Sequence, residues 1–417
     1  MSHTVSKRAK VIAWLCTLVY FASYLTRNNF SVMMLNICNE MGTAKSALAI
    51  VVTGLTIAYG LGQIISGLMG DKIKPQLMLT AGLALACACN IAIFFVSNIT
   101  LMTVIWCING FAHSMLWPPI VRIMSMYLTD EEYSYSAVRV SWGSSFATII
   151  MYLALPQLLK ITSWRVLMLV CDAVGIGIML AWTLSNPRFL KDPISNSRNT
   201  KKADVTFTRI VPPKFVYLSV ALIMLGIILQ GILRDGVQNW MPFYLSERFG
   251  IPESDAFTST VLLAIFSVIS FAVFDLLHRK VFKNEVFCAA MIFALSMIAA
   301  LALYVISILT ELAVPAMFLM AIIVASMHGI NLMLITVVPK RIVKSGKVST
   351  YSGILNACTY IGAAISSYGF ALLAENFGWS FTILMWVFIS AAGLGVCLAA
   401  TPLWKRFRKE YSDNSDV

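Results

Sequence analysis

Long runs of apolar residues, separated by short polar stretches, dominate this chain. A helix needs about 20 mainly apolar residues to cross a bilayer, and twelve runs are long enough. They are residues 11–37, 46–69, 77–97, 100–128, 135–159, 164–184, 214–245, 256–277, 285–308, 311–337, 347–374 and 379–402. Charged residues make up only 12% of the sequence, against about 25% in soluble domains. The sequence therefore predicts an all-α polytopic membrane protein with twelve transmembrane helices.

Positively charged residues are concentrated in alternate loops. The basic loops start with Lys7, Arg8 and Lys10 and finish with Lys405, Arg406, Arg408 and Lys409, while the opposite loops hold only Lys45, Lys160, Arg165 and Arg248. Cytoplasmic loops carry the excess of Lys and Arg, so we expect a multi-pass protein of the cell membrane with both termini inside. The formal charge of +12 follows from this topology, and we expect no nucleic-acid partner.

The sequence repeats itself across a polar segment, residues 185–213, whose Pro, Ser, Asn and Lys content is typical of a linker. The corresponding residues are Arg27 and Arg234, Asp71 and Asp275, His113 and His328, and Trp164 and Trp379. A repeat of about half the chain indicates two pseudo-symmetric six-helix bundles. The predicted parts are a cytoplasmic N-terminus (1–10), the two bundles (11–184 and 214–402), the linker (185–213) and a cytoplasmic tail (403–417).

Arg27 lies beyond the middle of the first apolar run. A guanidinium near mid-bilayer costs at least ~2.5 kcal/mol, so we expect it to face a polar cavity with an anionic partner. Tyr20 and Tyr24 share its helical face. The alternative is that Arg27 pairs with a carboxylate on another helix to fix packing. Arg234 has the matching position in the seventh run, and two such arginines favour binding of an anion, with bidentate geometry that suits phosphate.

The fourth run contains Trp117-Pro118-Pro119, which predicts a kink because proline removes a backbone donor. His113 lies four positions before Trp117 and shares its face. It either bonds to a neighbouring helix or takes part in substrate or proton handling.

Three residues are candidates for coupling transport to protons: His113, its repeat-related partner His328, and Asp235, which follows Arg234. Histidine titrates near pH ~6.5. An acid beside an arginine is normally held ionised, so we interpret Asp235 first as a residue that fixes Arg234.

Other polar positions offer weaker signals. Asn356 and Tyr360 lie four positions apart in the eleventh run and are candidates to line a cavity, although close helix packing explains most of the small and polar residues around them. The acidic residues Asp130, Glu131 and Glu132 are expected to lie in a solvated turn.

The turn Gly67-Leu-Met-Gly70-Asp71-Lys72 resembles the loop between the second and third spans of the major facilitator superfamily. Three stretches narrow the resemblance to the organophosphate:phosphate antiporters. They are Tyr20-x-x-x-Tyr24-Leu-x-Arg27, Trp117-Pro118-Pro119-x-x-Arg122 and Arg234-x-Gly236-Val237-x-x-Trp240. The resemblance implies the major facilitator fold, a conformational loop at Gly67, Asp71 and Lys72, and binding of a phosphoryl group by Arg27 and Arg234. The aromatic residues that it implies for the cavity are Tyr20, Tyr24, Tyr59, Trp117 and Tyr360.

Four positions depart from that family. Gln63 stands where the glycerol-phosphate transporters have a lysine, and Ser145 where they have a histidine. Asn28 replaces a basic residue, and Asp235 adds a negative charge. The site is therefore expected to be less positive than is usual in the family.

The sequence predicts a secondary transporter of a small organic anion, an organophosphate exchanged for inorganic phosphate. The alternatives are a proton- or sodium-coupled symporter of a carboxylate or other monoanion, and a substrate-sensing receptor of the same fold. No enzyme motif is present. We expect no cofactor or metal, a monomeric state, and the anion and the lipid bilayer as partners.

Overall fold

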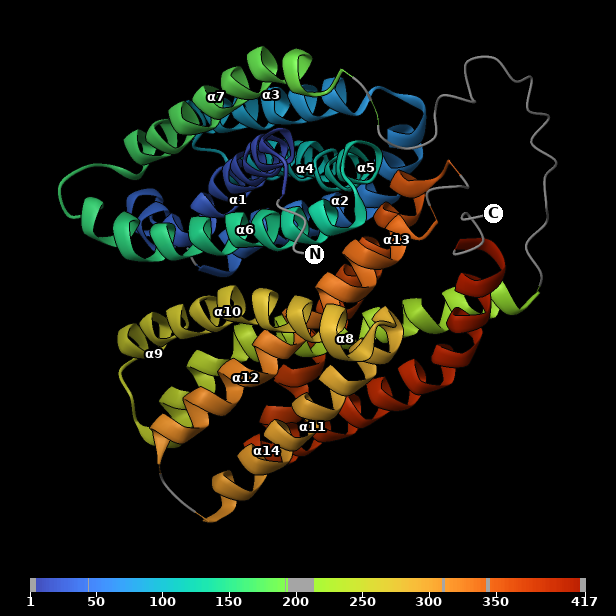
Figure 1. The fold of residues 1–417 in the computed structure, drawn as a ribbon. Helices are drawn as coiled ribbons and strands as arrows, with labels where there is room; N and C mark the ends of the chain where they lie inside the picture. Colours follow the sequence, from blue (N-terminus) through green and yellow to red (C-terminus); the bar gives the residue numbers. More distant parts are fainter. Residues whose placement is uncertain are drawn as a thin grey trace. The chain divides into compact units, whose positions relative to one another are not determined.

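The computed structural model describes residues 5–43, 45–191, 193, 214–309, 312–342 and 346–412. Its first seven helices are α1 (Lys7–Met41), α2 (Lys45–Lys72), α3 (Pro75–Phe94), α4 (Ile99–Ser114), α5 (Trp117–Tyr127), α6 (Asp130–Leu158) and α7 (Trp164–Phe189). They are followed by α8 (Lys214–Phe249), α9 (Glu253–Ser259), α10 (Val261–Leu277), η1 (His278–Phe282), α11 (Glu285–Leu309), α12 (Ala313–Asn331), η2 (Leu332–Val337), α13 (Val338–Lys340), α14 (Val348–Phe407) and η4 (Arg408–Ser412). Figure 1 shows their order along the chain.

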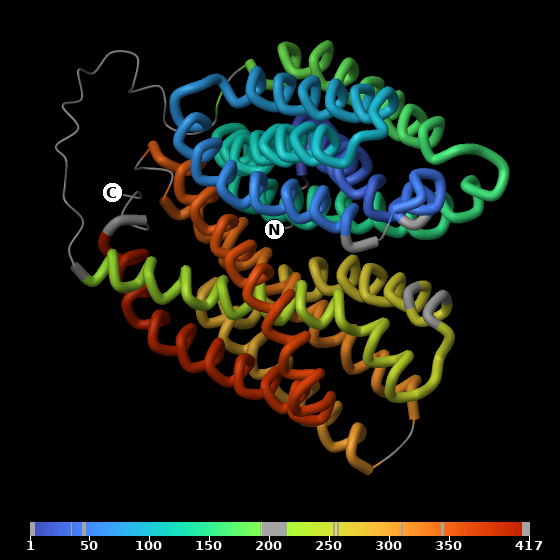
Figure 2. Tube along the Cα trace, turned by 180° about the vertical axis from the view of Figure 1, so that it is seen from behind, coloured from blue at the N-terminus to red at the C-terminus, as the bar shows by residue number. Residues whose placement is uncertain are grey.

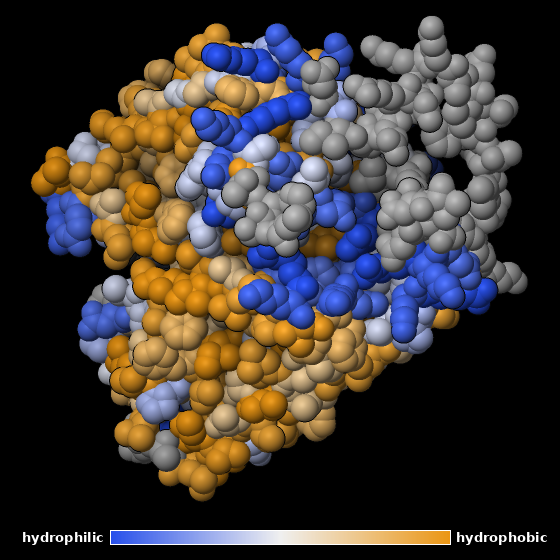
Figure 3. Space-filling view, viewed as in Figure 1, coloured by the Kyte–Doolittle hydropathy of each residue, from blue (hydrophilic) through white to orange (hydrophobic). Residues whose placement is uncertain are grey.

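Eleven helical segments of the described residues are long and apolar enough to cross a membrane. The longest one contains α14, whose backbone leaves the helical conformation at Gly378, with φ 77° and ψ 172°. Glycine adopts this positive φ without steric cost, so α14 accounts for both runs predicted at 347–374 and 379–402. Hydrophobic residues cover the sides of the helices on the face drawn in Figure 3, and hydrophilic residues gather near helix ends. The predicted all-α fold with twelve spans is confirmed.

The chain divides into two compact units, which we describe separately. The N-terminal unit comprises Met1–Thr206 with Ser345–Ala357, and the C-terminal unit comprises Phe207–Lys344 with Cys358–Val417. The beginning of α14 therefore belongs to the N-terminal unit and its remainder to the C-terminal unit. Within the predicted linker, α7 continues to Phe189, while residues 192 and 194–213 lie outside the described residues. The predicted domain limits stay predictions.

Small residues let the helices of each unit approach closely. A methyl group on Gly143 of α6 would lie 2.6 Å from the carbonyl oxygen of Thr17 on α1. In the C-terminal unit, one on Gly362 of α14 would lie 2.7 Å from the backbone nitrogen of Ile232 on α8. Figure 2 shows α8 and α14 running beside each other. In lipid, no hydrophobic effect drives helices together, and close packing of this kind stabilises their association instead.

The two units repeat one polar contact at corresponding places. Trp164 Nε1 donates to Glu40 Oε2 at 2.7 Å in the N-terminal unit, and Trp379 Nε1 donates to Glu247 Oε2 at 2.7 Å in the C-terminal unit. Glu40 and Glu247 have the same separation in sequence as Arg27 and Arg234. The internal repeat read from the sequence therefore recurs as a repeated structure.

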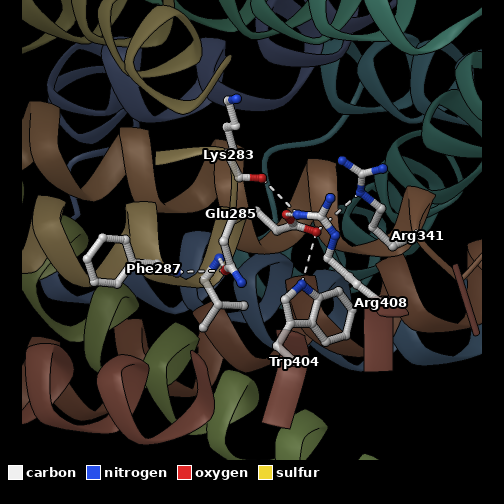
Figure 4. Close-up of polar contacts among 8 residues, drawn as sticks. Lys283, Glu285, Phe287, Arg341, Trp404 and Arg408 are labelled. Carbon is white, nitrogen blue, oxygen red and sulfur yellow. Dashed lines mark hydrogen bonds and ion pairs between the residues drawn. The ribbon is translucent and has the colours of Figure 1, made fainter. Parts of the chain in front are cut away.

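A buried carboxylate ties together helix ends of the C-terminal unit (Figure 4). Glu285, which has no exposed surface, accepts hydrogen bonds from Trp404 Nε1 at 3.0 Å and Arg408 Nη1 at 3.1 Å. Its Oε1 also lies 3.3 Å from Arg341 Nε. Two cations and an indole N–H offset the cost of removing this charge from water.

The expectation of a solvated turn at residues 130–132 is wrong for Glu132. Thr129 caps α6, and Glu132 closes the capping box by accepting from the Thr129 backbone nitrogen at 3.2 Å. Its other oxygen accepts from Ser6 Oγ at 2.6 Å, so the side chain is buried. The acidic run starts a helix because carboxylates favour the positive N-terminal end of the helix dipole.

Candidate functional site

Arg27 projects from α1 into a cage of aromatic rings in the N-terminal unit. Its Cζ lies 4.4 Å from the ring centre of Tyr24 and 4.7 Å from that of Tyr59 on α2. Only 8% of the residue is exposed, and its Nε lies 3.4 Å from Asn28 Oδ1. Aromatic faces attract a cation. The N–H groups lie in the plane of the guanidinium and do not point at these ring faces. This arrangement holds a positive charge inside a membrane helix and fixes its orientation.

The aromatic wall extends from α1 to the start of α5. Tyr20 lies 5.2 Å from Tyr24 and 4.9 Å from Trp117, measured between ring centres. Trp117 reaches this position because α4 ends at Ser114 and α5 begins at Trp117, followed by two prolines. The predicted kink therefore sets the direction of the tryptophan, whose buried Nε1 has no hydrogen-bond partner among the described residues.

Helices α2 and α14 add neutral polar groups. Asn356 Nδ2 lies 3.5 Å from Tyr59 Oη, and Gln63 is one turn beyond Tyr59 on α2. Gln63 has no exposed surface, and neither atom of its amide group has a partner among the described residues. Ser145 is buried in α6. The structure thus joins six of the predicted site residues by contacts: Tyr20, Tyr24, Arg27, Tyr59, Trp117 and Asn356. For Gln63 and Ser145 it shows burial but no contact with these six.

His113 lies at the interface of α4 and α1. Its Nδ1 is 3.3 Å from Ser23 Oγ, and its buried Nε2 has no hydrogen-bond partner among the described residues. The sequence left two roles open for His113, a bond to a neighbouring helix and a part in substrate or proton handling. This contact is the first of them.

Amide side chains around α1 form a site feature that the sequence reading missed. The carbonyl oxygen of Thr26 accepts from Asn90 Nδ2 at 2.8 Å and from Asn109 Nδ2 at 3.3 Å. Asn29 Nδ2 donates to Asn90 Oδ1 at 2.8 Å. These contacts hold α1 on both sides of Arg27. Asparagines within apolar runs were the available signal, because polar residues in membrane helices are costly and usually bonded across helices.

The C-terminal unit contains the repeat-related arginine in a different setting. Arg234 donates from Nε to Asp235 Oδ1 at 2.8 Å and from Nη2 to Asp235 Oδ2 at 2.9 Å. One turn earlier on α8, Gln230 Nε2 donates to the Met327 carbonyl oxygen at 3.1 Å. His328 packs edge-on against Phe271, 5.6 Å away, and Tyr360 is half-buried on α14.

The turn after α2 contacts the beginning of α14. Asp71 accepts hydrogen bonds from the backbone nitrogens of Ser349 at 2.9 Å and Thr350 at 3.0 Å, and from Thr350 Oγ1 at 2.6 Å. A methyl group on Gly67 would lie 2.8 Å from the Ser349 carbonyl oxygen, so glycine permits the approach. Lys72 is exposed. A carboxylate in this position satisfies unpaired amides at a helix N-terminus.

Arg122, in the middle of α5, contacts the same turn. Its Nη1 donates to the carbonyl oxygens of Gly70 and of Ile73, the latter at 3.0 Å.

Comparison with known proteins assigns the family. The sequence model of the Major Facilitator Superfamily matches residues 16–367. The chain belongs to the Major Facilitator Superfamily. It is accordingly a multi-pass membrane transporter protein by family and is not an enzyme. Its fold is similar to that of another superfamily member, the proton:xylose symporter XylE, with a TM-score of 0.74, 12% identity, and coverage of 98% of this chain and 97% of that one.

Curated relatives of this superfamily member include organophosphate transporters. The glycerol-3-phosphate transporter of Bacillus subtilis (strain 168) is 23% identical over 401 residues, covering 88% of this chain and 86% of the relative. A probable hexose phosphate transport protein of Chlamydia muridarum is 25% identical, and the alignment covers 55% of each chain. The membrane sensor protein UhpC of Salmonella typhimurium is 22% identical over 60% of this chain and 59% of the relative. The resemblance to the organophosphate:phosphate antiporter group is confirmed.

Proposed function

We propose that this protein is a secondary transporter that carries a small organic anion, an organophosphate, across the cell membrane in exchange for inorganic phosphate. The observation that carries the proposal is Arg27, a guanidinium held between the rings of Tyr24 and Tyr59 inside a membrane helix. A charge in this position is costly unless it serves an anion or a pathway. The planar guanidinium edge matches the oxygens of a phosphoryl group in a bidentate manner.

Arg234 is the second half of the proposed clamp. It occupies the repeat-related place in the C-terminal unit, and Asp235 fixes it through two hydrogen bonds. Secondary transporters with two homologous bundles bind substrate near mid-membrane and expose it alternately to each side. The names of the relatives, a glycerol-3-phosphate transporter and a probable hexose phosphate transport protein, support an organophosphate as the substrate class. The protein acts as a monomer in the bilayer, with both termini cytoplasmic.

Asp71 provides the proposed conformational element. Its bonds to Ser349 and Thr350 join the turn after α2 to α14, and alternating access requires such helix-end contacts to form and break.

The test is exchange by purified protein in liposomes loaded with phosphate. Labelled glycerol 3-phosphate should enter only when phosphate is present inside. Arg27→Lys and Arg234→Lys should each weaken apparent affinity at least tenfold, about 1.4 kcal/mol, because an ammonium lacks the bidentate fork. Arg188→Lys, the same exchange at an exposed position of α7, is the matched control and should retain wild-type affinity. Wild-type affinity in either arginine variant would exclude that arginine from the clamp.

A sensor is the second candidate, because one relative is named a membrane sensor protein. A sensor would bind glycerol 3-phosphate with the same dependence on Arg27 but would show neither uptake nor exchange in the loaded liposomes.

A further inference from the structure

Asp172 is a carboxylic acid buried inside the N-terminal unit. It lies in the third turn of α7, within an apolar segment long enough to cross the membrane, and only 1% of its surface is exposed. The Cys87 thiol on α3 donates a hydrogen bond to this carboxyl group. The Oδ1 atom has no hydrogen-bond partner among the described residues.

Glu285 shows which partners surround another buried carboxyl group of this protein. Arg341, Arg408 and the indole N–H of Trp404 surround it (Figure 4). Asp172 has one weak thiol donor in their place. An ionised carboxylate without a cation is very costly away from water, so the protonated, neutral form is the one that these surroundings accommodate.

No ion pair joins Asp172 to a cation among the residues that the structure describes. Helix α7 packs against α1 and α3. The titratable neighbours are thiols: Cys87 on α3, with Cys89 near it, and the adjacent Cys171 on α7. A hard cation such as calcium or magnesium would require several oxygen ligands, whereas the described side chain that bonds to Asp172 is a thiol. The chemistry of the site therefore fits a proton.

Asp172 also lies behind the anion-binding part of α1. Gly175, one turn further along α7, is close enough that a methyl group there would lie 3.0 Å from Thr26 Cγ2 and 3.3 Å from Cys87 Sγ. Thr26 immediately precedes Arg27, and its carbonyl oxygen is held by Asn90 and Asn109. The part of α7 that carries Asp172 therefore packs beside the residue that precedes Arg27.

We propose that Asp172 is a proton-binding site and that its proton is carried inward with the organophosphate. Phosphate returns on the unprotonated protein, so that each exchange moves one net proton. A negative charge on Asp172 would oppose a second negative charge entering beside Arg27, so anion binding favours the protonated acid. By thermodynamic reciprocity, proton binding favours the anion to the same degree. The coupling rests on the proposed function, whereas the protonated state of Asp172 does not depend on it.

Infrared spectroscopy of the purified protein in lipid tests the protonated state without any ligand. At neutral pH the wild type should show a carbonyl band of a protonated carboxyl group that is missing in Asp172→Asn. Cys87→Ala should shift this band by removing the thiol donor, while Cys89→Ala, the matched control on the same helix, should leave it in place. The two cysteine variants keep Asp172, so they decide the question if Asp172→Asn does not fold. A spectrum unchanged in both Asp172→Asn and Cys87→Ala would overturn the proposal.

Uptake of labelled glycerol 3-phosphate tests the coupling. External pH is held constant, so that the charge of the substrate does not vary, and internal pH is raised. The wild type should accumulate substrate several-fold in response, whereas Asp172→Asn should exchange substrate without responding to the gradient. Equal gradient-driven accumulation by the two proteins would refute the coupling. If the wild type takes up no organophosphate under any condition, the proposed function fails, and the infrared band still decides the proton site.

Discussion

At the scale of single residues, the electrostatics of the site depends on which side chains stand beside Arg27. The resemblance predicts that two neutral residues, Gln63 and Ser145, take the places of a lysine and a histidine of the glycerol-phosphate transporters. Gln63 is fully buried, and neither atom of its amide group has a hydrogen-bond partner among the described residues. We predict that this amide group contacts the anion. A neutral amide offers hydrogen bonds to a substrate but little charge stabilisation.

We therefore predict that Gln63→Lys combined with Ser145→His will move selectivity toward phosphate esters by about tenfold, or ~1.4 kcal/mol, because added positive charge favours the more negative ligand. Competition of glycerol 3-phosphate with a monocarboxylate for uptake measures the ratio. Gln63→Leu, which adds no charge, serves as the comparison. An unchanged ratio in the double variant would mean that these two positions do not contact the anion.

At the scale of helices, the contact between α2 and the beginning of α14 depends on glycine. A methyl group on Gly353 would clash with the carbonyl oxygen of Gln63 and would lie 2.9 Å from Gly67 Cα. Gly369, on the same helix, has nothing within 4 Å of that position. The first glycine is required for close packing and the second is not.

Gly353→Ala is accordingly expected to cost about 1–3 kcal/mol through overpacking and to lower the melting temperature and the exchange rate. Gly369→Ala is expected to stay within about 0.5 kcal/mol of wild type. Thermal unfolding in detergent, followed by tryptophan fluorescence, compares the two. Equal melting temperatures would show that α2 and α14 do not approach as closely as described.

At the scale of the whole molecule, the distribution of charge predicts orientation. Loops rich in Lys and Arg should lie inside. A fluorescent protein fused after the C-terminus should therefore fold in the cytoplasm and fluoresce. Alkaline phosphatase, which is active only outside, should be active when fused after Lys160 and inactive when fused after Lys202. The reverse pattern would invert the topology, and activity at both sites would contradict the number of spans between them.

The sequence alone determined the architecture and predicted the chemical type of the site. The sequence is sufficient to identify twelve spans, two related halves and the paired arginines Arg27 and Arg234. The reason is that hydropathy and charge act on each segment independently of its neighbours. The repeat then assigned equivalent places to residues in the two halves. The prediction from local sequence was wrong at Glu132, which was expected in a solvated turn. Its side chain is buried because it takes part in a helix cap and bonds to Ser6, which is distant in sequence.

Tertiary structure decided everything that depends on which helix faces which. It placed Tyr59 of α2 against Arg27 of α1, and it brought Asp71 to the backbone of Ser349, 278 positions away. It also distinguished two buried acids that look alike in sequence. Glu285 has arginines from distant helix ends around it, whereas the partner of Asp172 among the described residues is a thiol. The energy of a buried charge is set by its partners in space, and these are not visible until the helices are packed.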